Sequence, residues 1–230
     1  MPARKAKRPG TAPVGIMGGT FDPVHFGHLR LAQEAAETLG LERVRWVPAG
    51  RPWHRTQPRS AAKHRLEMVR LAIRRNPLFE LDDAEIRQGS PGYTVETLER
   101  LRKKFGPRRP LVLLLGTDAF RGLTTWERWR NLFDLAHVFV AQRPGHSLTP
   151  GGMPAALASE WRRRAGTPAA LRQRPAGAVV TYGTTALDIS ASAIRAHFAQ
   201  SRSPRYLLPS VVLDYSRRHV LYTKENGAQR

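Results

Sequence analysis

The chain contains no cysteine, which excludes disulfide bonds, cysteine zinc sites and thiolate catalysis. It also has no apolar run near the length of about 20 residues that a membrane-spanning helix needs. The longest strong apolar run, residues 111–115, has the length of a strand, and no signal-peptide segment follows the basic residues at the start. These absences are typical of a cytoplasmic protein without membrane contact, and we expect residues 1–13 to form a basic flexible tail.

Several phosphate-binding and catalytic motifs are also missing. The sequence has no Gly-x-x-x-x-Gly-Lys-Ser/Thr loop and no Gly-x-Gly-x-x-Gly turn after a predicted strand. It has no His-Glu-x-x-His pair either. These absences argue against a P-loop enzyme, a dinucleotide-dependent dehydrogenase and a zinc protease, so any phosphate site must be built from other residues.

Acidic residues are few: 18 Asp and Glu stand against 38 Lys and Arg, for a formal net charge of +20. One interpretation is nucleic-acid binding, in which clustered cations displace counterions from phosphates. The other is a general preference for arginine, with part of the charge serving small phosphorylated substrates. Only six of the basic residues are lysine, and the arginines are spread over the whole chain. This distribution favours the second interpretation and leaves nucleic-acid binding as an alternative.

Short apolar runs alternate with amphipathic segments along the chain. This alternation predicts an α/β fold with a Rossmann-like, doubly wound parallel sheet. We expect residues 14–230 to form a single domain that ends in a small helical C-terminal part, at about residues 189–222. The predicted strands span residues 14–17, 44–47, 78–81, 111–115, 136–141 and 179–182, and the predicted helices span residues 29–39, 60–75, 94–105, 154–164, 192–200 and 209–218.

Residues 18–28 are the most informative segment and read Gly-Gly-Thr-Phe-Asp-Pro-Val-His-Phe-Gly-His. They connect the first predicted strand to the first predicted helix, where α/β sheets place ligands and helix amides attract phosphate. His25 and His28 are three residues apart and can face one point, while Gly27 allows close approach of the backbone to a ligand. Imidazole can donate a hydrogen bond to phosphate and, when protonated, adds charge.

This segment resembles the Gly-Gly-x-Phe-Asp-Pro-x-His-x-Gly-His signature of the nucleotidyltransferase superfamily. Residues 189–195, Ile-Ser-Ala-Ser-Ala-Ile-Arg, resemble its second signature, Ile-Ser-x-Thr/Ser-x-Ile-Arg, at the start of a late helix. The resemblance implies that His25, His28 and Arg195 are catalytic. It implies an ATP site of Gly18, Gly19, Thr20, Phe21, His25, Gly27, His28, Asp118, Ile189, Ser190, Ser192 and Arg195.

Segments between the two signatures are similar to those of bacterial nicotinate mononucleotide adenylyltransferases. They are the Tyr-Thr pair at 93–94, the Gly-Thr-Asp segment at 116–118, the tryptophan at 126 and the Arg-Pro-Gly turn at 143–145. Residues 54 and 55 match the family's Pro-Pro-His-Arg/Lys loop, although Trp53 replaces its second proline. The resemblance implies a mononucleotide site of Tyr93, Thr94, Trp126, Glu127, Arg143, His54 and Arg55.

The residue types fit such a site. Trp126 offers a flat face on which a pyridine ring could stack, or it is a core tryptophan. We predict that Thr94 is the N-cap of a helix whose amides could hold a carboxylate. Asp118, at the end of a predicted strand, could accept hydrogen bonds from ribose hydroxyls or could be the N-cap of the turn that follows.

The resemblance implies transfer of the adenylyl group of ATP to nicotinate mononucleotide, giving nicotinate adenine dinucleotide and pyrophosphate in NAD biosynthesis. The attacking phosphate is already a nucleophile near neutral pH, because its second pKa lies near 6. We expect Mg²⁺ to bridge the phosphates through water and substrate oxygens, with no protein metal ligands. An acceptor such as nicotinamide mononucleotide stays open as an alternative, and the sequence is compatible with a homo-oligomer.

Overall fold

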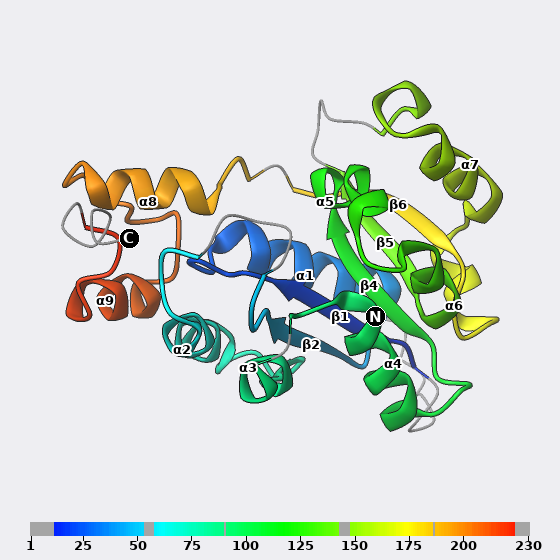
Figure 1. Cartoon of the computed structure of the whole chain (residues 1–230), viewed down its shortest axis with the longest axis horizontal. Coiled ribbons are helices and arrows are strands. Elements are labelled where there is room, and N and C mark those ends of the chain that lie inside the picture. The colour runs from blue at the N-terminus through cyan, green and yellow to red at the C-terminus, as the bar shows by residue number, and fades with distance from the viewer. Residues whose placement is uncertain (1–11, 53–57, 90, 143–147, 186, 224–230) are drawn as a thin grey trace, which may run out of the picture.

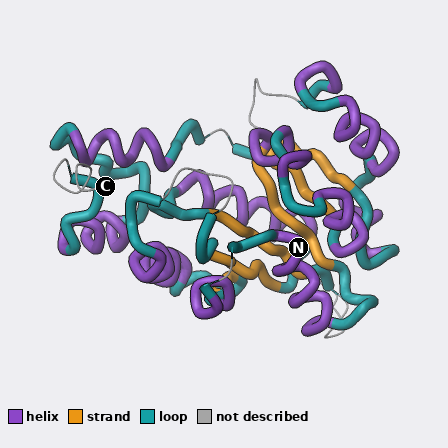
Figure 2. Tube along the Cα trace, viewed as in Figure 1, coloured by secondary structure: helices purple, strands orange, loops and turns teal. Residues whose placement is uncertain are grey.

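The computed structural model describes residues 12–52, 58–89, 91–142, 148–185 and 187–223. Within these residues, one sheet contains six strands in the order β3-β2-β1-β4-β5-β6, and every neighbouring pair is parallel (Figures 1 and 2). The predicted α/β class and doubly wound parallel sheet are therefore confirmed. The strands are β1 (Val14–Gly19), β2 (Arg43–Pro48), β3 (Phe79–Leu81), β4 (Leu111–Gly116), β5 (His137–Gln142) and β6 (Val179–Gly183).

The long helices lie where the 3.6-residue periodicity predicts them. Short elements between them were not predicted, because four or five residues are too few to show a period. The helices are α1 (Phe26–Leu39), α2 (Ala62–Ile73), α3 (Ala84–Gln88), α4 (Thr94–Phe105), α5 (Thr117–Arg121), α6 (Leu132–Leu135), α7 (Ala155–Arg164), α8 (Ala191–Ala199) and α9 (Ser210–Arg218). Short 3₁₀ helices span Leu123–Thr125, Trp129–Asn131, Pro150–Gly152 and Pro168–Arg172.

The sheet carries a hydrophobic layer on each face, as its central strand illustrates. In β4, Leu111, Leu113 and Leu115 pack with residues of α4, α6 and α7, whereas Val112 and Leu114 pack with residues of α1. Successive side chains of a strand point to opposite faces, so a continuous apolar run is what a strand covered on both sides requires. The run therefore fixes β4 at the centre of a three-layer arrangement, with helices on both faces of the sheet (Figure 1).

The last two helices extend the layer that contains α1 and α2. Val212 and Leu213 of α9 and Ile194 of α8 belong to the same hydrophobic cluster as Met68 of α2. Figure 1 shows α8 and α9 beyond the first half of the sheet, on the side of α2. No helix in the described ranges is both long enough and apolar enough to cross a membrane. The tail over residues 1–13 and the limits of a single domain stay predictions.

A buried histidine makes the stability of this fold depend on pH. His137 is fully buried in β5, where its Nδ1 accepts a hydrogen bond from the Ala178 N–H and its Nε2 lies 2.9 Å from the Arg174 carbonyl oxygen. This pairing requires the neutral ring with its proton on Nε2. Burial lowers the pKa of His137 from 6.5 to about 4.

We expect wild-type protein to lose stability relative to His137→Gln as the pH falls from 7 to 5. In this window the unfolded chain binds a proton at residue 137 and the folded chain does not, so lower pH favours unfolding. The loss should reach about 2 kcal/mol at pH 5. Urea unfolding of both proteins across this range measures it. A difference between the two proteins that stays constant with pH would contradict this assignment.

Candidate functional site

A cavity of about 790 Å³ opens at the carboxyl ends of β1 and β4. The chain runs from β1 outward to β2 and β3 on one side, and from β4 to β5 and β6 on the other. The cavity therefore lies where the strand order reverses, which is the usual ligand position in an open parallel sheet. Gly18 and Gly19 end β1 at its wall, and Gly116 ends β4 there.

The two histidines stand at the beginning of α1 and share one wall of this cavity. Helix α1 begins at Phe26, three residues earlier than predicted, so His25 is the N-cap and His28 lies in the first turn. Their rings stack with centroids 3.7 Å apart. The backbone N–H of His25 donates to His28 Nδ1 at 3.3 Å. Because Nδ1 accepts this bond, neutral His28 carries its proton on Nε2, which can donate to a phosphate oxygen.

Gly27 leaves room for this stacked pair. A Cβ atom at position 27 would lie 3.1 Å from two atoms of the His25 ring and 3.6 Å from the carbonyl oxygen of Ile189. Any other residue would press against the imidazole, which is 5% exposed. The glycine of the signature therefore leaves space for the His25 ring beside the segment that leads into α8.

The second signature contacts the first at Asp22. Arg195 of α8 donates from Nη1 to the carbonyl oxygen of Asp22 at 2.7 Å. Ser190 caps α8, since its Oγ accepts the Ala193 N–H at 3.2 Å. Arg195, Ser190 and Ile189 all line the cavity. The structure therefore brings the two signatures, more than 150 residues apart in the sequence, to one site.

Arg65 of α2, which is not among the predicted site residues, holds two loops that border the cavity. Its side chain is 1% exposed and donates to three backbone carbonyls, at 3.0 Å from Thr20, 2.7 Å from Ala49 and 3.0 Å from Gly50. These carbonyls belong to the loops that follow β1 and β2. A sequence signal exists: Arg65 precedes the apolar residues Met68 and Val69 by three and four positions, on the buried face of the helix.

The opposite part of the cavity is formed by the start of α4 and by Trp126. The structure corrects one prediction: Tyr93, not Thr94, is the N-cap of α4, and Thr94 is the first helical residue. Both Thr94 and Trp126 line the cavity. Glu85 of α3 lies beside them, where its Oε1 accepts the Thr97 hydroxyl at 2.6 Å. Burial raises the pKa of the Glu85 carboxyl.

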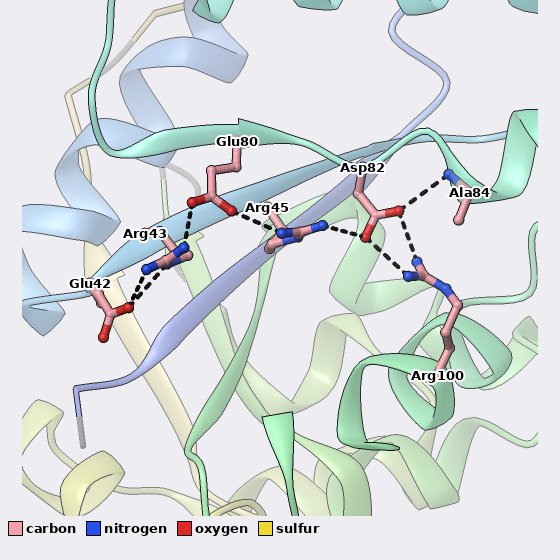
Figure 3. A network of polar contacts seen from close by, with 7 residues as sticks. All are labelled: Glu42, Arg43, Arg45, Glu80, Asp82, Ala84 and Arg100. Carbon is pink, nitrogen blue, oxygen red and sulfur yellow. Dashed lines mark hydrogen bonds and ion pairs between the residues drawn. The ribbon is translucent and has the colours of Figure 1, made fainter. Parts of the chain in front are cut away.

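A chain of ion pairs connects α4 to the edge of the sheet (Figure 3). Asp82, whose side chain is 3% exposed, accepts hydrogen bonds from Arg45 of β2, from both terminal nitrogens of Arg100 of α4, and from the Ala84 N–H. Burial would raise the pKa of Asp82, but the hydrogen bonds from these partners lower it overall. A charged Asp82 thus ties the start of α3, through Ala84, and the middle of α4, through Arg100, to the edge of the sheet. Glu85 and Thr94 reach the cavity from these two helices.

The structure places most of the predicted site residues around one cavity. Ser192, Tyr93 and Glu127 are not among its lining residues, although each neighbours one that is. His54, Arg55 and Arg143 lie outside the described residues. The predicted residues that line it are Gly18, Gly19, Thr20, Phe21, His25, Gly27, His28, Thr94, Asp118, Trp126, Ile189, Ser190 and Arg195.

The described residues contain no group of three or more His, Asp or Glu side chains placed to hold a metal ion. Two of the cavity carboxylates, Asp22 and Glu85, accept hydrogen bonds from other protein groups.

Sequence comparison defines the class of protein. The profile of the cytidylyltransferase-like family matches residues 16–197, so the chain belongs to this family of nucleotidyltransferases. The family generally uses a divalent metal ion with ATP. Close relatives define the family more narrowly, as that of the nicotinate-nucleotide adenylyltransferases.

Two relatives carry this narrower assignment, and both are named "Probable nicotinate-nucleotide adenylyltransferase". The protein from Dechloromonas aromatica is 55% identical over 212 residues, which cover 91% of this chain and 97% of the relative. The protein from Halorhodospira halophila is 48% identical over 200 residues, which cover 86% of this chain and 90% of the relative.

Solved structures support the fold. The nicotinic acid mononucleotide adenylyltransferase of Plasmodium falciparum, complexed with NaAD, aligns with a TM-score of 0.69 over 91% of this chain and 97% of that one. The same protein complexed with APC aligns with a TM-score of 0.65 over 92% and 97%. Sequence identity is 16% in both alignments, so this likeness concerns the fold.

Proposed function

We propose that this enzyme transfers the adenylyl group of ATP to nicotinate mononucleotide, giving nicotinate adenine dinucleotide and pyrophosphate in NAD biosynthesis. One observation carries the proposal: both nucleotidyltransferase signatures line a single cavity that also contains Trp126 and the start of α4. The relatives' shared name supplies the acceptor. A phosphate oxygen of the mononucleotide attacks the α-phosphorus of ATP, the bond from that phosphorus to the bridging oxygen breaks, and pyrophosphate leaves.

On the ATP side, His25, His28 and Arg195 hold the phosphates and stabilise the charge that moves onto pyrophosphate. Preorganised donors of this kind act without reorganisation during the reaction, and each can contribute several kcal/mol. The stacked rings and the bond from Arg195 to Asp22 supply the preorganisation. Catalysis then consists of positioning two anions in line and neutralising charge, with no covalent enzyme intermediate.

The other residues of the ATP site contribute backbone and short side chains. Gly18, Gly19 and Thr20 give the nucleotide close access to the end of β1, and Phe21 packs edge-on against the His28 ring. Ser190 and Ser192 offer hydroxyls at the start of α8, where helix amides favour negative charge. Asp118, exposed at the cavity, accepts hydrogen bonds from ribose hydroxyls.

On the acceptor side, the pyridine ring stacks on Trp126 and the nicotinate carboxylate meets the amides at the start of α4, near Tyr93 and Thr94. Glu127 neighbours the stacking residue. His54, Arg55 and Arg143 complete this part of the site by family resemblance.

Mg²⁺ would enter this site with ATP, because the cavity carboxylates of Asp22 and Glu85 already accept hydrogen bonds from protein groups. It neutralises phosphate charge when bound. We also propose that the enzyme works in the cytoplasm, where ATP is kept.

Replacing Trp126 with alanine is expected to raise the KM for nicotinate mononucleotide by about tenfold and to change the KM for ATP by less than about twofold. Loss of ring stacking removes on the order of 1 kcal/mol of binding free energy, in addition to that of the lost apolar contact. Only the acceptor carries a pyridine ring. Steady-state kinetics with each substrate varied in turn measures both values. Equal changes in the two constants would contradict stacking on Trp126.

An acceptor panel tests the function itself. Pyrophosphate release is measured with ATP and nicotinate mononucleotide, nicotinamide mononucleotide or phosphopantetheine. The proposal predicts the highest kcat/KM for nicotinate mononucleotide. Preference for either of the other acceptors would overturn the assigned substrate while leaving adenylyl transfer in place.

A further inference from the structure

The carboxylate of Asp22 joins three segments that are far apart in the sequence. It is buried, and it accepts hydrogen bonds from the Arg59 N–H at 2.7 Å, the Ser60 hydroxyl at 2.5 Å and the Tyr222 hydroxyl at 2.7 Å. Three donors satisfy a buried carboxylate that would otherwise be costly. The backbone of residue 59 is therefore fixed to the first signature.

Tyr222 is suited to remain a donor in this cluster. Its side chain is buried, and burial together with the adjacent Asp22 raises the pKa of its phenol. The hydroxyl therefore stays protonated near neutral pH and donates to Asp22. The Ser60 and Tyr222 hydroxyls also lie 3.3 Å from each other, so the two hydroxyl partners of Asp22 form one cluster.

Arg59 is anchored by its backbone, but its side chain is exposed and lines the cavity. Among the described residues its guanidinium forms no salt bridge, in contrast to Arg45 and Arg100. Only one other arginine lines the cavity in the described part of the chain, and that is Arg195, which donates to the carbonyl oxygen of Asp22. Asp22 thus holds the backbone of Arg59 and accepts the guanidinium of Arg195, and both arginines line the cavity.

We propose that Arg59 is a further phosphate-binding residue, which contacts the pyrophosphate portion of ATP together with Arg195. The inference rests on the proposed function, since it assigns this residue to the same reaction. The backbone of Arg59 is fixed, and its guanidinium forms no salt bridge with the described residues, so it can offer a forked donor to phosphate oxygens. Tyr222 is a positioning residue, because it acts on Arg59 through Asp22.

The test begins with Arg59→Gln. Binding of magnesium pyrophosphate, measured by titration calorimetry, should weaken by about tenfold, and the KM for ATP should rise by a similar factor. The KM for nicotinate mononucleotide should change less than about twofold. Arg59→Lys should recover part of the loss. Arg75→Gln is the matched control, because Arg75 is exposed beyond the other end of α2 and does not line the cavity.

The outcomes separate this inference from the proposed function. Wild-type turnover with unchanged pyrophosphate binding in Arg59→Gln would overturn the role of Arg59 alone. Absence of adenylyl transfer by the wild type would overturn the proposed function and this inference with it. If Arg75→Gln weakens pyrophosphate binding as much as Arg59→Gln does, the effect is one of net charge, and the role of Arg59 is overturned.

A double-mutant cycle tests the positioning role of Tyr222. Tyr222→Phe alone should weaken pyrophosphate binding by about threefold. Added to Arg59→Gln, it should cause no further loss, because both changes act through one contact. Additive effects would overturn positioning through Asp22. Thermal unfolding of each variant shows whether the fold is intact.

Discussion

Replacing His28 with alanine is expected to lower kcat by tenfold or more while the protein stays folded. The ring lies in the first turn of α1, stacked on His25, with its Nδ1 held by the N–H of His25. Its Nε2 proton is then directed by a fixed ring, so the transition state gains a donor that needs no rearrangement. Removing one such donor typically costs on the order of a hundredfold in kcat.

The measurement combines steady-state kinetics with circular dichroism. His64→Ala is a matched control, because His64 is a helical histidine that contacts Tyr215 and does not line the cavity. The control should keep kcat within about twofold. An unchanged kcat in His28→Ala, or an equal decrease in the control, would contradict the catalytic role.

Replacing Arg65 with methionine is expected to destabilise the protein by about 3 kcal/mol or more and to impair ATP binding. The guanidinium is 1% exposed and satisfies carbonyls of Thr20, Ala49 and Gly50. Methionine fills a similar volume but leaves these oxygens without a donor, and hydrogen bonds to a buried charged group contribute roughly 1.5–3 kcal/mol each. Because Thr20 belongs to the first signature, the loop that surrounds ATP should loosen.

Urea unfolding measures the stability change, and the KM for ATP measures the effect on the site. Arg70→Met provides the control on the same helix. Arg70 is exposed and pairs with Glu67, so its loss should cost less than about 1 kcal/mol. Similar costs at positions 65 and 70 would show that the carbonyl contacts of Arg65 contribute little.

Local patterns sufficed to predict the sheet and its long helices. The run in β4 is apolar on both faces, and α4 carries Val95, Leu98 and Leu101 at helical spacing, all fully buried. The glycine that ends α1, Gly40, adopts the left-handed conformation expected of a helix C-cap. In each case a few neighbouring residues determine the conformation.

The supporting contacts of the site could not be predicted in the same way. The bond from Tyr222 to Asp22 joins residues 200 positions apart, and no local period signals it. Glu85 belongs to a five-residue helix, too short to show a face. The error at Thr94 has a similar cause, since threonine is a common N-cap but the chain enters the helix one residue earlier, at Tyr93.

The structure also shows how this chain uses part of its arginine. Arg102 donates to backbone carbonyls of Pro175, Leu135 and its own helix end, and Arg45 and Arg100 hold Asp82 (Figure 3). Guanidinium groups suit such multiple, planar contacts. These residues have structural roles, so the net charge of +20 does not by itself measure affinity for nucleic acid.

The fate of labelled phosphorus distinguishes adenylyl transfer to the mononucleotide phosphate from other reactions of ATP. The enzyme is incubated with nicotinate mononucleotide, Mg²⁺ and ATP labelled at either the α- or the γ-phosphorus. We expect the α label in nicotinate adenine dinucleotide and the γ label in pyrophosphate, in equal amounts. Transfer of the γ label to the mononucleotide, or release of pyrophosphate without a dinucleotide, would contradict it.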